Sequence, residues 1–209
     1  MFEVARRLSL AVLLTVVSLC AVDGQLLDRV LAIVDGSPIT LSDVTAAVRL
    51  GLVETPANVD ERAALNALID RRLQLIEVNR YLPPEPTPEA IEARLAETRR
   101  RFASDDAFQT ALKETGVSPI DLRAGVRDNL RIESYLTQRF GAGYQPGEDE
   151  VLAYYRGHQA EFTRAGTVRP YAEARDEARR QLIASRTGSM IRDWVDGLRR
   201  RIEVTLLPK

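Results

Sequence analysis

The two segments of this chain that read as β-strands lie at its opposite ends. Residues 28–34 (DRVLAIV) are rich in branched apolar side chains, and the turn signal Asp35-Gly36-Ser37-Pro38 leads into Ile39-Thr40-Leu41. Far downstream, residues 202–206 (IEVTL) alternate apolar and polar side chains as a strand does. A lone strand leaves its backbone groups unpaired. We therefore expect the two ends to meet in one small sheet.

The chain between these strands has the pattern of helices. The strongest amphipathic pattern covers residues 60–80, where apolar side chains recur at spacings of three and four. Start and stop signals predict further helices over 41–52, 88–102, 105–115, 119–140, 148–162 and 170–201. The segment Thr163 to Val168 reads as a linker. The sequence thus predicts a mainly α fold with a small sheet that joins the N- and C-terminal strands.

The first residues have the features of an export signal. Arg6 and Arg7 precede an uncharged, almost wholly apolar run over 8–22, and cleavage before Gln25 is expected. The run is short for a membrane span, although an uncleaved anchor is an alternative. Lipidation at Cys20 is a weaker alternative, because the bulky Leu19 stands where a small residue is expected. We expect a periplasmic protein that meets the membrane only through this signal peptide before cleavage.

Composition and motifs exclude several classes of function. The chain has one histidine, His158, and one cysteine, Cys20, so an ordinary zinc or copper site lacks ligands. No glycine-rich phosphate loop, HExxH pattern or EF-hand is present. The net charge of -1 and a pI of about 6.0 do not fit a nucleic-acid binder. We expect no catalytic residues, no metal and no cofactor.

Five segments together resemble the SurA family of periplasmic chaperones. They are DRVLAIVDGSPITLSDV (28–44), ALNALIDRRLQLIEVNR (64–80), LRAGVRDNLRIESYLTQRF (122–140), VLAYYRGHQAEF (151–162) and the ending WVDGLRRRIEVTLLP (194–208). In that family a strand, a turn and a helix that opens with Ser-Asp precede a helix of the Leu-Ile-Asp-x-x-Leu type, which here is residues 68–73. The resemblance implies a multi-helix SurA-like chaperone domain closed by a C-terminal helix and strand.

The sequence departs from the family at one point. Family members usually carry one or more parvulin-type prolyl isomerase domains between the helix at 151–162 and the closing helix. Here only a few residues follow Phe162 before that helix begins, and the paired histidines of parvulin sites cannot exist with His158 alone. The resemblance therefore implies the chaperone scaffold without the isomerase. We expect a signal peptide over 1–24, a helical domain over 25–162, and a closing helix and strand over 163–209 that pack back on it.

These observations predict a chaperone-like protein that binds unfolded exported polypeptides without ATP, with outer-membrane proteins among its clients. A structural or assembly module for one envelope or secretion partner is the alternative, and a peptidyl-prolyl isomerase is more remote. The expected clients bind an apolar groove between the N-terminal helices and the closing helix. Its predicted peptide-binding residues are Ile91, Leu95, Phe102, Phe108 and Leu112, since the proline-rich connector 83–88 separates their helices from the main core. Alternatively, these five residues simply form core.

Overall fold

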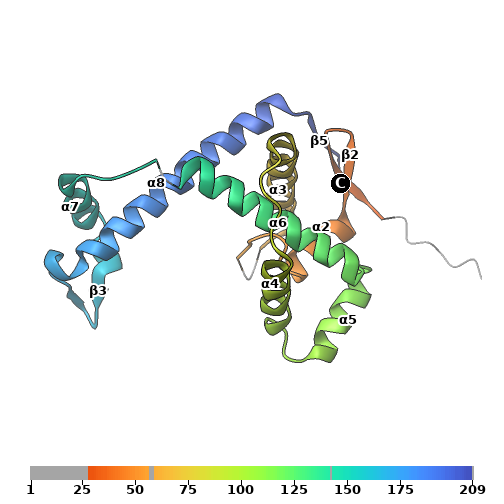
Figure 1. Ribbon diagram of the computed structural model, residues 1–209, viewed down its shortest axis with the longest axis horizontal. Coiled ribbons are helices and arrows are strands. Elements are labelled where there is room, and N and C mark those ends of the chain that lie inside the picture. The colour runs from red at the N-terminus through yellow and green to blue at the C-terminus, as the bar shows by residue number, and fades with distance from the viewer. Residues whose placement is uncertain (1–27, 57–58, 142, 209) are drawn as a thin grey trace, which may run out of the picture.

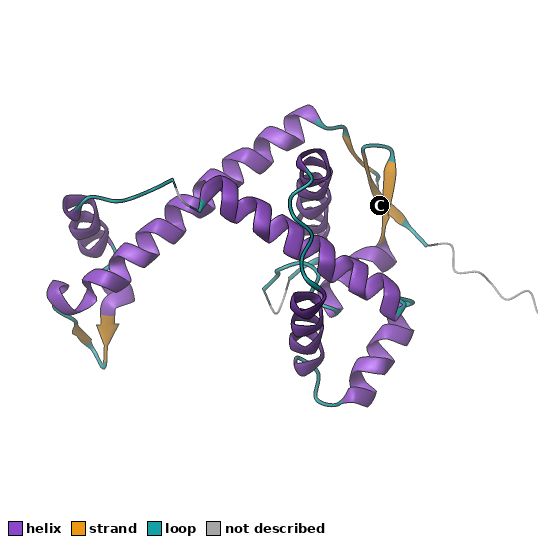
Figure 2. Cartoon of the chain, in the orientation of Figure 1, coloured by secondary structure: helices purple, strands orange, loops and turns teal. Residues whose placement is uncertain are grey.

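The computed structural model describes residues 28–56, 59–141 and 143–208, so the expected signal peptide lies outside the described residues. Helices make up most of this part of the chain (Figures 1 and 2). Their bounds are α2 (Leu41–Arg49), α3 (Glu61–Tyr81), α4 (Pro88–Arg100), α5 (Asp105–Thr115), α6 (Pro119–Phe140), α7 (Glu148–Gly157), the 3-10 helix η1 (Gln159–Phe162) and α8 (Tyr171–Arg201). The mainly α prediction is confirmed. No helix of the described residues is long and apolar enough to cross a membrane.

The two ends of the described chain meet in a three-stranded antiparallel sheet. Strand β1 (Val30–Val34) lies in the centre, between β2 (Ser37–Thr40) and β5 (Val204–Leu206). The expected pairing of the N- and C-terminal strands is confirmed, with Ile33 opposite Thr205. Asp35 and Gly36 form the tight turn between β1 and β2 with φ of 49° and 75°, a backbone conformation that favours glycine and tolerates aspartate.

Short-range side-chain contacts begin and end several helices as the sequence predicts. Thr40 and Asp43 form a reciprocal capping box at the start of α2, and Thr87 and Ser118 cap α4 and α6 ahead of a proline in the first turn. Gly116 ends α5 in the left-handed conformation. Helix α2 stops at Arg49, earlier than the predicted 52, because Gly51 turns the chain at a φ of 68°.

The main apolar core lies between the sheet and helices α2, α3 and α8. Ile39, Ile69 and Leu73 are fully buried in it, and Leu198 and Ile202 bring the closing helix into the same cluster. A second cluster surrounds α4, α5 and the start of α6. The C-terminal helix and strand are therefore part of the core that the N-terminal elements build.

Helix α8 joins two separate apolar clusters. Its second half packs on the N-terminal core, while Ala174, Ala178 and Leu182 of its first half pack against α7 and η1 at the other end of the molecule (Figure 1). Residues before and after the expected domain boundary at 162 therefore share one apolar cluster. The division into domains stays a prediction. The linker prediction for 163–168 is wrong in detail, because β3 (Thr163–Arg164) and β4 (Thr167–Val168) form a small hairpin.

Candidate functional site

The structure brings the five predicted peptide-binding residues into one cluster. Ile91, Phe108 and Leu112 are buried in it, and Leu95 and Phe102 are partly buried against it. The rings of Phe102 and Phe108 meet edge to face, with centroids 5.4 Å apart. Other members come from the end of α2, from α5 and from α6: Leu50, Ala111, Leu122 and Val126. Most of these residues are therefore core, and three of them also line a cavity, so their role in peptide binding stays a prediction.

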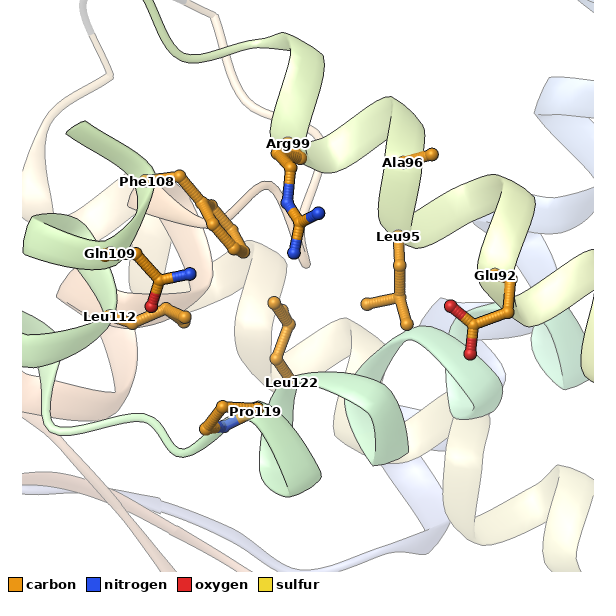
Figure 3. A pocket seen from close by; sticks show the side chains of 9 residues that line it. All are labelled: Glu92, Leu95, Ala96, Arg99, Phe108, Gln109, Leu112, Pro119 and Leu122. Atoms are coloured by element: carbon orange, nitrogen blue, oxygen red, sulfur yellow. The ribbon is translucent and has the colours of Figure 1, made fainter. Parts of the chain in front are cut away.

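A pocket of about 180 Å³ opens between α4, α5 and the start of α6 (Figure 3). Leu95, Phe108 and Leu112 of the predicted set line it, while Ile91 and Phe102 belong to the same apolar cluster but do not line the pocket. The other lining residues are Glu92, Ala96, Arg99, Gln109, Pro119 and Leu122. An apolar cavity of about 150 Å³ is large enough for benzene. The pocket therefore has the size of one aromatic or branched apolar side chain.

Charged side chains stand around this apolar lining. The Arg99 guanidinium lies over the Phe108 ring, 5.2 Å from its centroid, and its Nε is 3.2 Å from Oδ1 of Asp105. Glu92 pairs with Arg123 of α6 on the other side. Such exposed pairs contribute little to stability. The pocket thus has charged side chains at its rim and apolar side chains inside, an arrangement that suits side chains entering from an extended polypeptide.

Sequence reasoning missed the rim and the α6 side of the pocket. Arg99 follows Leu95 by four residues and so points to the same side of α4, where it lines the pocket. The spacing of Glu92, Leu95, Ala96 and Arg99 carried this signal. Pro119 and Leu122 could not be assigned, because no local pattern tells which helix packs against α4.

A second depression lies over the end of α3, the proline-rich connector and the second half of α6. It has a volume of about 270 Å³ and is lined by Tyr81, Pro83, Tyr135, Gln138 and Arg139. The ring centroids of Tyr135 and of Trp194 on α8 lie 5.6 Å apart. Neither this depression nor the pocket of α4, α5 and α6 is lined by a residue of α8, so the expected groove between the N-terminal helices and the closing helix stays a prediction.

The possible metal ligands of the described residues are dispersed. The described residues contain no group of three or more His, Cys, Asp or Glu side chains placed to hold a metal ion. His158 stacks on Tyr154 at a centroid distance of 4.0 Å, and its Nδ1 is 2.8 Å from the Tyr154 carbonyl oxygen. Through these contacts the His158 side chain packs against the last turn of α7. What the pocket offers is apolar surface with polar edges.

Comparison with known proteins places the fold. No model of a known family matches the sequence, and no curated protein matches it. Among solved structures, the chain is similar to one described with PEB4 and Cj1289, two SurA-like chaperones of Campylobacter jejuni, at a TM-score of 0.55 and 13% identity. The alignment covers 87% of this chain and 100% of that one. At this identity the likeness shows the fold alone, and that fold is the SurA-like chaperone domain predicted from the sequence.

Proposed function

We propose that this protein is a chaperone-like protein that binds unfolded exported polypeptides without ATP, outer-membrane proteins among them. The observation that carries the proposal is the open apolar pocket of α4, α5 and α6. A shared fold alone would be weak support, because function resides in sites. A pocket that accepts one apolar side chain, with charged residues at its rim, selects for exposed hydrophobic residues and not for a particular sequence. Unfolded polypeptides present such residues.

The proposal places the protein in the periplasm after removal of residues 1–24. Arg6 and Arg7 followed by the apolar run 8–22 support an export signal. Cj1289, one of the proteins described with the similar structure, is a periplasmic protein. Both observations are consistent with clients that are themselves in transit through the envelope.

The proposed role includes no catalytic step and no cofactor. Phe162 is followed directly by the β3–β4 hairpin and then by α8, and Tyr155 Oη donates a hydrogen bond to the Arg169 carbonyl oxygen at 2.5 Å across this connection. A parvulin domain would have to stand at this point of the chain. Prolyl isomerase activity well above background, abolished by one substitution, would contradict the proposal.

The test is to fill the pocket without touching the core. Ala96 is exposed and lines the pocket, so Ala96→Trp should occupy the space meant for a client side chain. Ala93→Trp makes the same change on the same helix at an exposed alanine that does not line the pocket. We expect Ala96→Trp to weaken binding of an unfolded barrel peptide by about tenfold, which is about 1.4 kcal/mol. Ala93→Trp should bind as the wild type does.

Melting temperatures of both variants provide the control for folding. Two results would contradict the pocket as the binding site. One is an equal loss of peptide binding in Ala96→Trp and Ala93→Trp. The other is undiminished binding by an Ala96→Trp variant whose melting temperature is unchanged. The wild-type protein should also suppress aggregation of several unrelated unfolded barrel proteins. Binding to one folded partner without any suppression would favour the assembly module instead.

A further inference from the structure

The two edges of the small sheet differ in how their backbone groups are satisfied. In an antiparallel pair, residues alternate between those that exchange hydrogen bonds with the neighbour and those whose N–H and C=O point to the other side. Strand β2 forms one edge and β5 the other, with β1 between them. The alternation therefore decides which groups each edge offers to a further strand.

The β2 edge is closed. Pro38 lies opposite Ile33 and follows the Val34–Ser37 pair that closes the turn, so its position faces outward, and proline has no N–H to offer there. The next outward amide belongs to Thr40, and it donates to Oδ2 of Asp43 at 2.9 Å. Proline on an edge is a common protection against pairing with another chain. On the outer side of β2, Pro38 thus has no N–H group, and the N–H group of Thr40 is already hydrogen-bonded to Asp43.

The β5 edge is open in the part of the chain that the structure describes. Asp35 N donates to Glu203 O and Leu207 N donates to Leu31 O, each at 3.0 Å, so residues 203, 205 and 207 bond inward to β1. The alternation turns the N–H and C=O groups of Val204 and Leu206 outward. The Leu206 side chain is 57% exposed. Backbone groups of the right spacing and an apolar side chain thus lie together on this edge.

We infer that the outer edge of β5 binds an extended segment of an unfolded polypeptide, which adds to the sheet as a fourth strand. Outward N–H and C=O groups two residues apart are matched by another backbone in the β conformation. The exposed Leu206 favours an apolar side chain beside it. The inference rests on the proposed function for the identity of its occupant, but not on the pocket of α4, α5 and α6.

The short length of β5 favours a client segment over a second copy of this chain. Three residues span about 10 Å. A stable interface between folded proteins buries roughly 1,200–2,000 Å². A strand of this length supplies a small part of that area. Weak pairing to a short strand instead suits a polypeptide that must be released again.

The first measurement is amide hydrogen exchange by NMR on the wild-type protein. The probe is a lysine-flanked peptide in which apolar residues alternate with serine. Without peptide, the Thr205 amide should exchange slowly and the Val204 and Leu206 amides fast. With saturating peptide, the amides of Val204 and Leu206 should become protected. Unchanged exchange at both amides would overturn the inference.

Two variants at Leu206 separate the contribution of the backbone N–H to peptide binding from that of the side chain. Leu206→Pro removes an outward N–H, as Pro38 does on the other edge, and leaves the inward ladder through Thr205 in place. We expect it to weaken peptide binding at this edge by about tenfold. Leu206→Thr keeps the N–H and should retain the protection of both amides. If Leu206→Pro lowers the melting temperature, the exchange measurement on the wild type still decides.

The outcomes distinguish this inference from the proposed function. If the peptide changes the NMR chemical shifts of Phe108 and Leu112 but not the amide exchange of β5, the inference is overturned and the pocket remains supported as the binding site. Protection at β5 without shifts at the pocket would support the inference and contradict the pocket. Protection that appears without peptide as the protein concentration rises, together with a dimer mass, would assign the edge to a second copy and overturn the choice of occupant.

Discussion

Arg199 on the closing helix holds Asp70 on α3 with two nitrogen atoms, although 129 positions separate them in the sequence. Its Nε lies 2.7 Å and its Nη2 lies 2.6 Å from Oδ1 of Asp70. Nη2 also donates to the Asn66 carbonyl oxygen at 3.3 Å. Both side chains are about one-third exposed. This contact joins the C-terminal helix to the N-terminal helices beside the apolar core.

Arg199→Ala should destabilise the protein and change the titration of Asp70. Burial raises the pKa of Asp70 above its usual range, and Arg199 opposes that rise. Without Arg199, the Asp70 pKa should rise further, and the free energy of unfolding should fall by about 1–2 kcal/mol, as for a partly buried charged hydrogen bond. NMR titration of the carboxyl group and urea unfolding measure the two effects. An unchanged Asp70 pKa in the variant would contradict the pairing.

The raised pKa of Asp70 also predicts the sign of a pH effect. Above the ordinary value of 3.8 and below its folded pKa, Asp70 binds more protons in the folded state than in the unfolded state. Its contribution to stability is therefore lost as pH rises through this window. Asp70→Asn should remove this part of the pH dependence. The measurement is the free energy of unfolding as a function of pH, and its slope is compared between the wild type and Asp70→Asn.

Glu148 should give the opposite dependence at the other end of α8. Arg175 and then Tyr171 lower the pKa of Glu148 to about 2 by hydrogen bonding to its carboxylate, and these bonds join α7 to α8. In the unfolded state Glu148 titrates near 4.5, so its contribution is present above that pH and is lost as pH falls toward about 2. Amide exchange in α7 should accelerate over this window. Glu148→Gln should lack the transition.

Leu198→Ala should test the role of α8 in the main core. Leu198 is 1% exposed, and its truncation should cost about 2–5 kcal/mol of unfolding free energy. Met190→Ala, on the same helix at a residue 36% exposed, is the matched control and should cost much less. Chemical denaturation of both variants measures the difference. Equal stabilities would show that the C-terminal helix contributes little to the core.

Phe108→Ala should separate the two roles of the predicted binding residues. Phe108 is 4% exposed and contacts Phe102 as well as the pocket, so truncation should cost about 3–5 kcal/mol. Ala96→Trp, in contrast, should leave the melting temperature near that of the wild type while it weakens binding. A Phe108→Ala variant with wild-type stability would mean that this ring is not core.

Local signals in the sequence determined where most elements begin and end. Thr40 with Asp43, and Thr87 with Pro88, act over three residues or fewer, so no distant contact is needed to predict the cap. The pairing of β1 with β5 could also be predicted, because residues 202–206 had partner strand material only near 28–41. Periodicity likewise identified the apolar face of α3.

Only the tertiary structure decided what each apolar face packs against. A helical period places Leu95 and Ala96 on one side of α4, but α5 and α6 become the other walls of the pocket through contacts far apart in sequence. For the same reason the sequence could not show that Trp194 of α8 lies beside Tyr135, while Phe108 faces a pocket whose walls are α4, α5 and α6. Periodicity fixes the direction of a side chain within its own element, whereas the partner depends on the mutual fit of all elements in the core.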